Sequence, residues 1–330
     1  MQRKWQVLVV TSVAVFISFL DVTIVNIAFP NIQASFPDAS LAALSWILNA
    51  YNIVFAALLV PAGRLADRIG RRRMFFIGLL TFLAASTLCG LAPSVPVLVA
   101  ARVLQAVGAA ALVPTSLALL LPEFPLEQRA TATALWAAMG GIAAATGPSL
   151  GGVLVHATSW RAVFFVNLLF GIAVLVPARR LLRERRELNP GPLPDALGVG
   201  LLVSGIALLS LAIVKGQDWG WGSAAVLGSL AGAAMLLALF AWRSATHAAP
   251  VVELPLFRVR SFAVACAGVF AFALGFYALL LANILFLTQV WHYSILKAGF
   301  AVITTEPTQT NCPDLNKESN GSAGKIACPP

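Results

Sequence analysis

Charged residues are scarce in this sequence. Asp, Glu, Lys and Arg make up 11% of its 330 residues, whereas they make up about 25% of a typical soluble domain. Hydrophobic residues make up 59%, and several apolar runs reach about 20 residues, the length that crosses a bilayer as a helix. The lack of charge excludes an ordinary soluble domain. The apolar runs predict an all-α polytopic membrane protein in contact with the lipid bilayer.

Histidine and cysteine are also rare, with three of the former and four of the latter. These residues are His156, His247, His292, Cys89, Cys266, Cys312 and Cys328. The cysteine spacing fits neither a metal site nor a disulfide framework, so we expect no metal and no cofactor. A membrane-embedded enzyme is the alternative from a different class. It would need a nucleophile, a base or metal ligands that converge, and the sequence offers no such set.

Acidic residues are fewer than basic ones, 13 against 22, and the net charge is +9. The arginines are confined to short loops between apolar segments, which argues against a nucleic-acid partner. Most basic residues fall on the same side of the membrane as the N-terminus. Before residue 304 the other side receives only Arg161, Lys215 and Lys297. The positive-inside rule therefore predicts a cytoplasmic N-terminus and location in the cell membrane.

The apolar runs predict nine membrane spans. We place them at about 6–29, 41–61, 74–92, 97–121, 131–155, 162–178, 196–214, 223–242 and 262–287. The first six form one unit over residues 1–178. A basic, proline-rich linker follows at 179–195, because neither a helix interior nor a membrane tolerates such a stretch well. Two further helices occupy 196–242.

The last part of the chain is predicted to hold one complete span and the start of another, within residues 243–303. Polar residues begin at Thr304 and continue to the end, so the tenth span is not completed. We expect residues 304–330 to be a polar, disordered tail. The abrupt change also leaves open that the chain is a truncated or frame-shifted gene product.

Residues 63–73 (GRLADRIGRRR) form the longest polar interruption in the first half of the chain. Five arginines in eleven residues cannot lie in hydrocarbon without a large cost. We therefore expect this stretch to be a loop in water on the cytoplasmic side.

Two charged residues lie inside predicted spans. Asp21 is about 22 Å from the cytoplasmic face, at about 1.5 Å per helical residue. Arg102 is about 7 Å below the outer face of a roughly 30 Å core. The matched depths indicate that the two side chains pair inside the bundle. A protonatable pair in a proton relay and a structural salt bridge both fit this pattern.

Other polar and small residues in the spans are weaker candidates. Gln105 shares a helix face with Arg102 and is a predicted partner. Four more could line a cavity or hydrogen-bond between helices: Asn26, Asn49, Tyr51 and Asn52. The fifth span has a stripe of small residues that permits either close static packing or a rocking interface. Its members are Gly140, Ala144, Gly147, Pro148, Gly151 and Gly152.

At these positions the chain resembles the drug/proton antiporters of the major facilitator superfamily. Residues 20–30 (LDVTIVNIAFP) resemble the first-helix motif, 63–73 the loop signature, 102–108 (RVLQAVG) the fourth-helix motif and 140–152 the fifth-helix antiporter motif. Trp160, Arg161 and residues 164–167 resemble the opening of the sixth helix. The two helices after the linker are similar to those of the fourteen-helix EmrB/QacA branch. A proline commonly follows the position of Asn167, where this chain has Leu168.

The resemblance implies a secondary active transporter that exports amphipathic, often cationic, drug-like compounds in exchange for protons. It implies that Arg102 takes part in proton coupling, with Asp21 as the titrating carboxylate. It also implies a cytoplasmic latch, formed by Gly63, Asp67, Arg68, Gly70 and Arg71. An exporter of a metabolite, siderophore or peptide with the same fold is the alternative.

The resemblance also indicates what is missing. The family's transport path lies between two six-helix halves, and this chain matches one half, the two inserted helices and the start of the second half. Because the latch also engages a helix of the second half, it should be incomplete here. We expect a chain that ends at Pro330 to export nothing.

Overall fold

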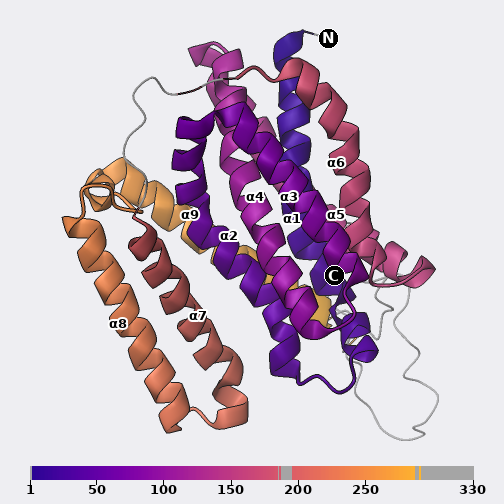
Figure 1. The fold of residues 1–330 in the computed structure, drawn as a ribbon, viewed down its shortest axis with the longest axis vertical. Helices are drawn as coiled ribbons and strands as arrows, with labels where there is room; N and C mark the ends of the chain where they lie inside the picture. The colour runs from indigo at the N-terminus through magenta and orange to yellow at the C-terminus, as the bar shows by residue number, and fades with distance from the viewer. Residues whose placement is uncertain (1, 185, 187–194, 287–289, 291–330) are drawn as a thin grey trace, which may run out of the picture.

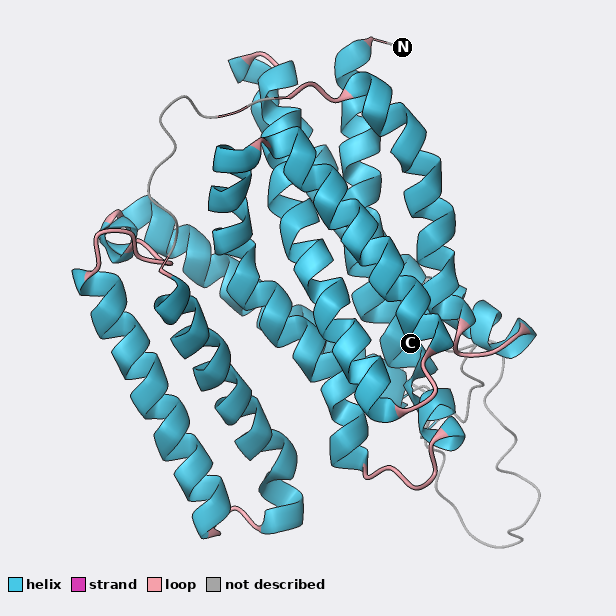
Figure 2. Cartoon of the chain, in the orientation of Figure 1, coloured by secondary structure: helices cyan, strands magenta, loops and turns pink. Residues whose placement is uncertain are grey.

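The computed structural model describes residues 2–184, 186, 195–286 and 290, and the regular structure in this part is entirely helical (Figures 1 and 2). The long helices are α1 (Arg3–Ser35), α2 (Leu41–Ile69), α3 (Arg71–Leu91), α4 (Val95–Leu120), α5 (Leu126–Ala157), α6 (Ala162–Leu181), α7 (Ala196–Trp219), α8 (Ala224–Thr246) and α9 (Arg260–Leu285). Two short 3-10 helices are η1 (Leu121–Glu123) and η2 (Leu254–Arg258). The predicted all-α architecture is confirmed.

Eight helices in the described residues, α1 to α8, are long and apolar enough to cross a membrane. They match the first eight predicted spans, and α9 lies where the ninth was placed. The helices run several residues beyond the predicted spans, because a helix can continue past the hydrocarbon into the polar interface. The start of the tenth span, the tail, and His292, Lys297, Cys312 and Cys328 lie outside the described residues.

Helices α1 and α4 occupy the centre of the six-helix bundle (Figure 1). Helix α1 packs against α4, α5 and α6, and α4 packs against α2 and α3. Two buried apolar clusters fill the bundle. One contains Ile17 of α1 and Ala106 of α4, and the other contains Ile24 of α1 and Leu98 of α4. Asp21 on α1 and Arg102 on α4 each lie between a member of one cluster and a member of the other. Apolar side chains therefore close the site in both directions along the helices.

Helices α7 and α8 form a hairpin that contacts the bundle through α2 (Figure 1). Asp195 caps α7 by accepting from the backbone N–H groups of Leu197 at 3.2 Å and Gly198 at 3.0 Å. Arg243 near the end of α8 also donates to both carboxylate oxygens of Asp195. These hydrogen bonds from Arg243 lower the pKa of Asp195 to about 2. The linker from Leu182 onward is described only in part, since residues 187–194 lie outside the described residues.

The prediction of a loop at residues 63–73 is wrong, because this stretch is helical at all but one residue. Helix α2 continues to Ile69, Gly70 alone is non-helical with a φ of 111°, and α3 begins at Arg71. A single residue in this left-handed region reverses the chain, and glycine adopts it without steric cost. Charge alone does not require a loop here, because long arginine side chains can leave a helix for water while the backbone stays hydrogen-bonded.

Candidate functional site

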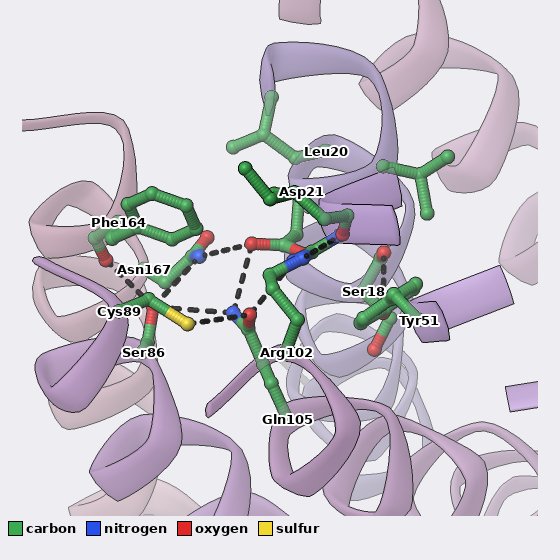
Figure 3. A network of polar contacts seen from close by, with 12 residues as sticks. Ser18, Leu20, Asp21, Tyr51, Ser86, Cys89, Arg102, Gln105, Phe164 and Asn167 are labelled. Atoms are coloured by element: carbon green, nitrogen blue, oxygen red, sulfur yellow. Dashed lines mark hydrogen bonds and ion pairs between the residues drawn. The ribbon is translucent and has the colours of Figure 1, made fainter. Parts of the chain in front are cut away.

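Asp21 of α1 and Arg102 of α4 form an ion pair in the middle of the bundle (Figure 3). Their side chains are 0% and 1% exposed, and Arg102 Nη1 donates to Asp21 Oδ2. The pairing expected from their depths is therefore present. Leaving either charge buried without the other would cost about 3–5 kcal/mol, so the two side chains hold each other in place.

Two side-chain amides complete the surroundings of the Asp21 carboxylate. Gln105 of α4 donates its Nε2–H to Asp21 Oδ1 at 2.8 Å, and Asn167 of α6 donates its Nδ2–H to the same oxygen at 2.9 Å. With Arg102 on Oδ2, the carboxylate accepts hydrogen bonds from one charged and two neutral donors (Figure 3). These hydrogen bonds tie α1, α4 and α6 together at one point.

The Arg102 guanidinium also contacts α2 and its own helix. Its Nε donates to the backbone carbonyl of Ile47 in α2 at 3.1 Å, and its Nη1 also donates to Gln105 Oε1 at 2.7 Å. The guanidinium carbon lies 4.0 Å from the centroid of the Tyr51 ring, a cation–π contact. Tyr51 is itself fully buried and donates its hydroxyl to the Ser18 carbonyl at 3.4 Å. A planar fork stacked on an aromatic ring is a geometry that lysine cannot reproduce.

Ser86 and Cys89 of α3 form a second layer behind the amides (Figure 3). Ser86 Oγ accepts from Gln105 at 3.2 Å and from Asn167 at 3.1 Å, and it donates to the Phe164 carbonyl at 2.8 Å. Cys89 donates its S–H to Gln105 Oε1 at 3.6 Å. Ser86, Cys89 and Asn167 were not predicted from the sequence as site residues. The available signal was the presence of polar side chains within otherwise apolar helices.

The family model for the Major Facilitator Superfamily matches residues 11–324, nearly the whole chain. The chain belongs to the Major Facilitator Superfamily. Its members are transporters, so the prediction that the chain is not an enzyme is confirmed.

Among relatives in this superfamily, the multidrug resistance protein Stp of Mycobacterium tuberculosis is 37% identical over 90% of this chain and 55% of its own length. The multidrug export protein EmrB of Haemophilus influenzae is 34% identical over 88% of this chain and 57% of its own. The tetracenomycin C resistance and export protein of Streptomyces glaucescens is 38% identical over 78% of this chain and 47% of its own length. The resemblance to the EmrB type is confirmed. The chain spans about half the length of these relatives.

Solved structures of the superfamily share the fold. A peptide transporter, POT, in complex with sulfate superposes with a TM-score of 0.53 at 16% identity, over 73% of this chain and 51% of that one. A bacterial homologue of the human lysosomal transporter Spinster, in an inward-facing and occupied conformation, superposes with a TM-score of 0.50 at 19% identity. That match covers 90% of this chain and 72% of the other.

The residues of the superfamily's loop signature lie at the turn between α2 and α3. Asp67 accepts from Arg71 Nε at 2.8 Å, across Gly70. Asp67 belongs to the last turn of α2. Gly63 faces Pro114 of α4, and Arg68 is exposed.

Two contacts attach this turn to segments far along the chain. Glu184, after α6, accepts the backbone N–H groups of Arg72 at 3.1 Å and Arg73 at 3.3 Å, which caps α3. Arg64 pairs with Glu253, after α8, at 2.6 Å. A cavity of about 530 Å³ lies beside this pair, and Asp67 and His247 are among its lining residues.

The remaining predicted residues divide into three groups. Tyr51 and Gln105 belong to the buried network, whereas Asn26 and Asn52 are exposed and Asn49 is half-buried. The Asn26 amide hydrogen-bonds its own helix, at the Val22 carbonyl. The glycines of the fifth-helix stripe lie against α1: Gly140 faces Phe19, Gly147 faces Thr23, and Gly151 faces Ile24. Pro148 and Gly152 are buried in the same helix.

Proposed function

We propose that this chain forms the proton-coupling half of an antiporter that exports amphipathic, drug-like compounds across the cytoplasmic membrane. The buried pair of Asp21 and Arg102 carries the proposal, since a carboxylate in a membrane-spanning bundle is costly and marks a relay or an ion pathway. Stp, EmrB and the tetracenomycin C protein, which are named for drug resistance or export, support this substrate class.

The geometry supports a coupling mechanism. The ionised Asp21 carboxylate draws Arg102 of α4 and Asn167 of α6 onto α1. A proton on Asp21 removes the negative charge that attracts Arg102, so the three helices are held together less tightly. If the ionised and protonated forms prefer different bundle arrangements, each protonation shifts the balance between them. Asp21 takes up protons on the outer side and releases them to the cytoplasm, while substrate moves the other way.

The N-terminus is proposed to be cytoplasmic, because of the distribution of basic residues. The turns at Gly70 and Leu182, and the exposed Arg68, then lie on the cytoplasmic side. The turns around residues 36–40, 92–94 and 220–223 lie outside.

Uptake into inverted membrane vesicles tests this function, because the cytoplasmic face points outward there and an exporter carries substrate into the lumen. The chain would be assayed alone and also joined to the second six-helix half of the Stp relative, with an amphipathic fluorescent cation as substrate. We expect transport by the chimera that stops when the pH gradient is collapsed, and at least a tenfold loss in an Asp21→Asn chimera. We expect none from the 330 residues alone, because they span about half the length of the relatives that they match.

Two outcomes would contradict the proposal. If transport by the chimera persists after both Asp21→Asn and collapse of the pH gradient, Asp21 is not part of the coupling mechanism. Efflux by the 330-residue chain alone would refute the expectation that it exports nothing. A panel that includes siderophores, peptides and neutral metabolites separates a drug exporter from an exporter of those compounds.

A further inference from the structure

The side-chain amides of Gln105 and Asn167 both donate to Asp21 Oδ1, but their oxygens differ in the hydrogen bonds that they accept. Gln105 Oε1 accepts from Arg102 Nη1 at 2.7 Å and from the Cys89 thiol at 3.6 Å. Turning the Gln105 amide over would point its NH₂ group at the guanidinium and the thiol hydrogen, so Gln105 is fixed in one orientation.

Asn167 is not fixed in this way. Its Nδ2 donates to Asp21 Oδ1 at 2.9 Å and to Ser86 Oγ at 3.1 Å. Its Oδ1 is buried and has no hydrogen-bond partner among the residues that the structure describes. A buried acceptor without a partner is unfavourable and calls for an explanation. Rotation of this amide would break no hydrogen bond to its oxygen, because that oxygen accepts none from the described residues.

Protonation of Asp21 changes which orientation of Asn167 is preferred. An ionised carboxylate only accepts hydrogen bonds, whereas a carboxylic acid also donates one. A proton on Oδ1 would meet the N–H of Asn167, donor against donor. Half a turn of the amide places Oδ1 of Asn167 about where Nδ2 was, within hydrogen-bond distance of Asp21. The Ser86 hydroxyl, which now donates to Phe164, can rotate to donate to the same oxygen.

We propose that Asn167 is a positioning residue whose side-chain amide rotates with the protonation state of Asp21, donating to the carboxylate and accepting from the acid. The proton comes from water and binds Asp21 Oδ1. The two hydrogen bonds that Asn167 Nδ2 donates, to Asp21 and to Ser86, break together with the one from Ser86 to the Phe164 carbonyl. Asn167 Oδ1 gains one O–H···O bond from Asp21 and one from Ser86, and no group is oxidised or reduced. Asn167 thereby transmits the charge state of α1 to α6. This inference rests on the proposed proton site at Asp21, but it does not require export.

Other groups around Asp21 come from each neighbouring helix. Tyr51 of α2, Cys89 of α3 and Arg102 of α4 carry or can gain charge close to it. Helix α5 meets α1 through glycines, and α6 contributes the neutral amide of Asn167. Arg102 stays cationic throughout the working pH range. An experiment should therefore follow the Asp21 carboxylate and the Asn167 amide together.

Isotope-edited infrared difference spectroscopy tests the proposal. The 330-residue chain, with ¹³C in the side-chain carbonyl of asparagine, would be placed in lipid nanodiscs and titrated with acid. We expect the acid-minus-alkaline spectrum to show a labelled asparagine carbonyl band that moves to lower frequency as Asp21 is protonated, because the carbonyl gains a hydrogen bond. The band should be lost in Asn167→Leu and in Asp21→Asn, and retained in Asn31→Leu, a matched control at an exposed asparagine of α1.

The Asn167→Gln variant keeps an amide but removes the labelled group, so the assignment holds even if Asn167→Leu does not fold. Absence of any labelled band on titration, or persistence of the band in Asn167→Gln, would overturn the proposal. The result is independent of transport. A band that responds to acid in a chimera without proton-dependent efflux would contradict the proposed function and leave this inference standing.

Discussion

At the scale of single residues, the two charged groups of the site are held by hydrogen bonds from several helices. Arg102 uses Nε on the Ile47 carbonyl and Nη1 on Asp21 and Gln105, with the Tyr51 ring below it. Buried charges are stable only when they are paired in this way. The loss of one partner therefore costs far more than the loss of both.

A double-mutant cycle tests this matching. We expect Arg102→Leu to lower the free energy of unfolding by about 3–5 kcal/mol, because the Asp21 charge is left unpaired. Combining it with Asp21→Leu should cost clearly less than the sum of the two single changes. Reversible unfolding of the purified chain in bicelles measures all four proteins. The control is Arg183→Leu at an exposed arginine, which should change stability by less than about 0.5 kcal/mol. Strict additivity would contradict the pairing.

At the scale of helices, the approach of α5 to α1 depends on the absence of side chains. A Cβ at Gly147 would lie 2.0 Å from Thr23 Oγ1, and one at Gly151 would lie 2.9 Å from Ile24 Cγ1. Thr23 also donates to the Ala143 carbonyl of α5 at 3.4 Å. With Gly140 facing Phe19, the α5 glycines contact α1 on both sides of Asp21 along the chain. A shift of α5 would therefore move the backbone that carries the carboxylate.

Gly147→Ala should separate α1 from α5. We expect a loss of about 1–3 kcal/mol from overpacking, against a gain of up to about 1 kcal/mol in helix propensity. Gly141→Ala is the matched control, because no atom lies within 4 Å of a Cβ built there. It should be neutral or slightly stabilising in the same unfolding measurement. Equal effects of the two substitutions would show that the close approach is unimportant.

At the scale of the whole molecule, ionic contacts gather at the end of the bundle that holds the N-terminus. Arg3 pairs with Glu123 at 3.0 Å, Arg64 with Glu253 at 2.6 Å, and Glu184 caps α3. Such partly exposed pairs contribute little stability each, at most about 1 kcal/mol. Their effect is to attach the segments after α6 and α8 to the turn between α2 and α3.

The orientation of the molecule can be tested by cysteine labelling. In intact cells, an impermeant maleimide should label Gly222→Cys, between α7 and α8, and should leave Arg183→Cys unlabelled until the membrane is opened. The unsubstituted chain gives the background from its native cysteines. The reverse pattern would place the N-terminus outside and would reverse the proposed direction of proton entry.

The sequence predicted the helices well, because nearly every span is a continuous apolar run with polar ends. It failed at residues 63–73, where charge was taken to require a loop and one glycine with a positive φ was sufficient. Asp21, Arg102 and Gln105 were found from the rarity of polar groups in the spans and from helical spacing. Asn167, Ser86 and Cys89 were not, because their role depends on how α3 and α6 turn toward α1.

The sequence by itself determined that this chain is a helical membrane protein of the Major Facilitator Superfamily with an acid and a base at one depth, since hydropathy and helical rise are local properties. Only the tertiary structure decided which side chains surround that pair. Those contacts join residues as far apart in the sequence as Asp21 and Asn167. The rotation of each helix about its own axis is set by packing between helices, and it places Asn167 inward and Asn26 outward.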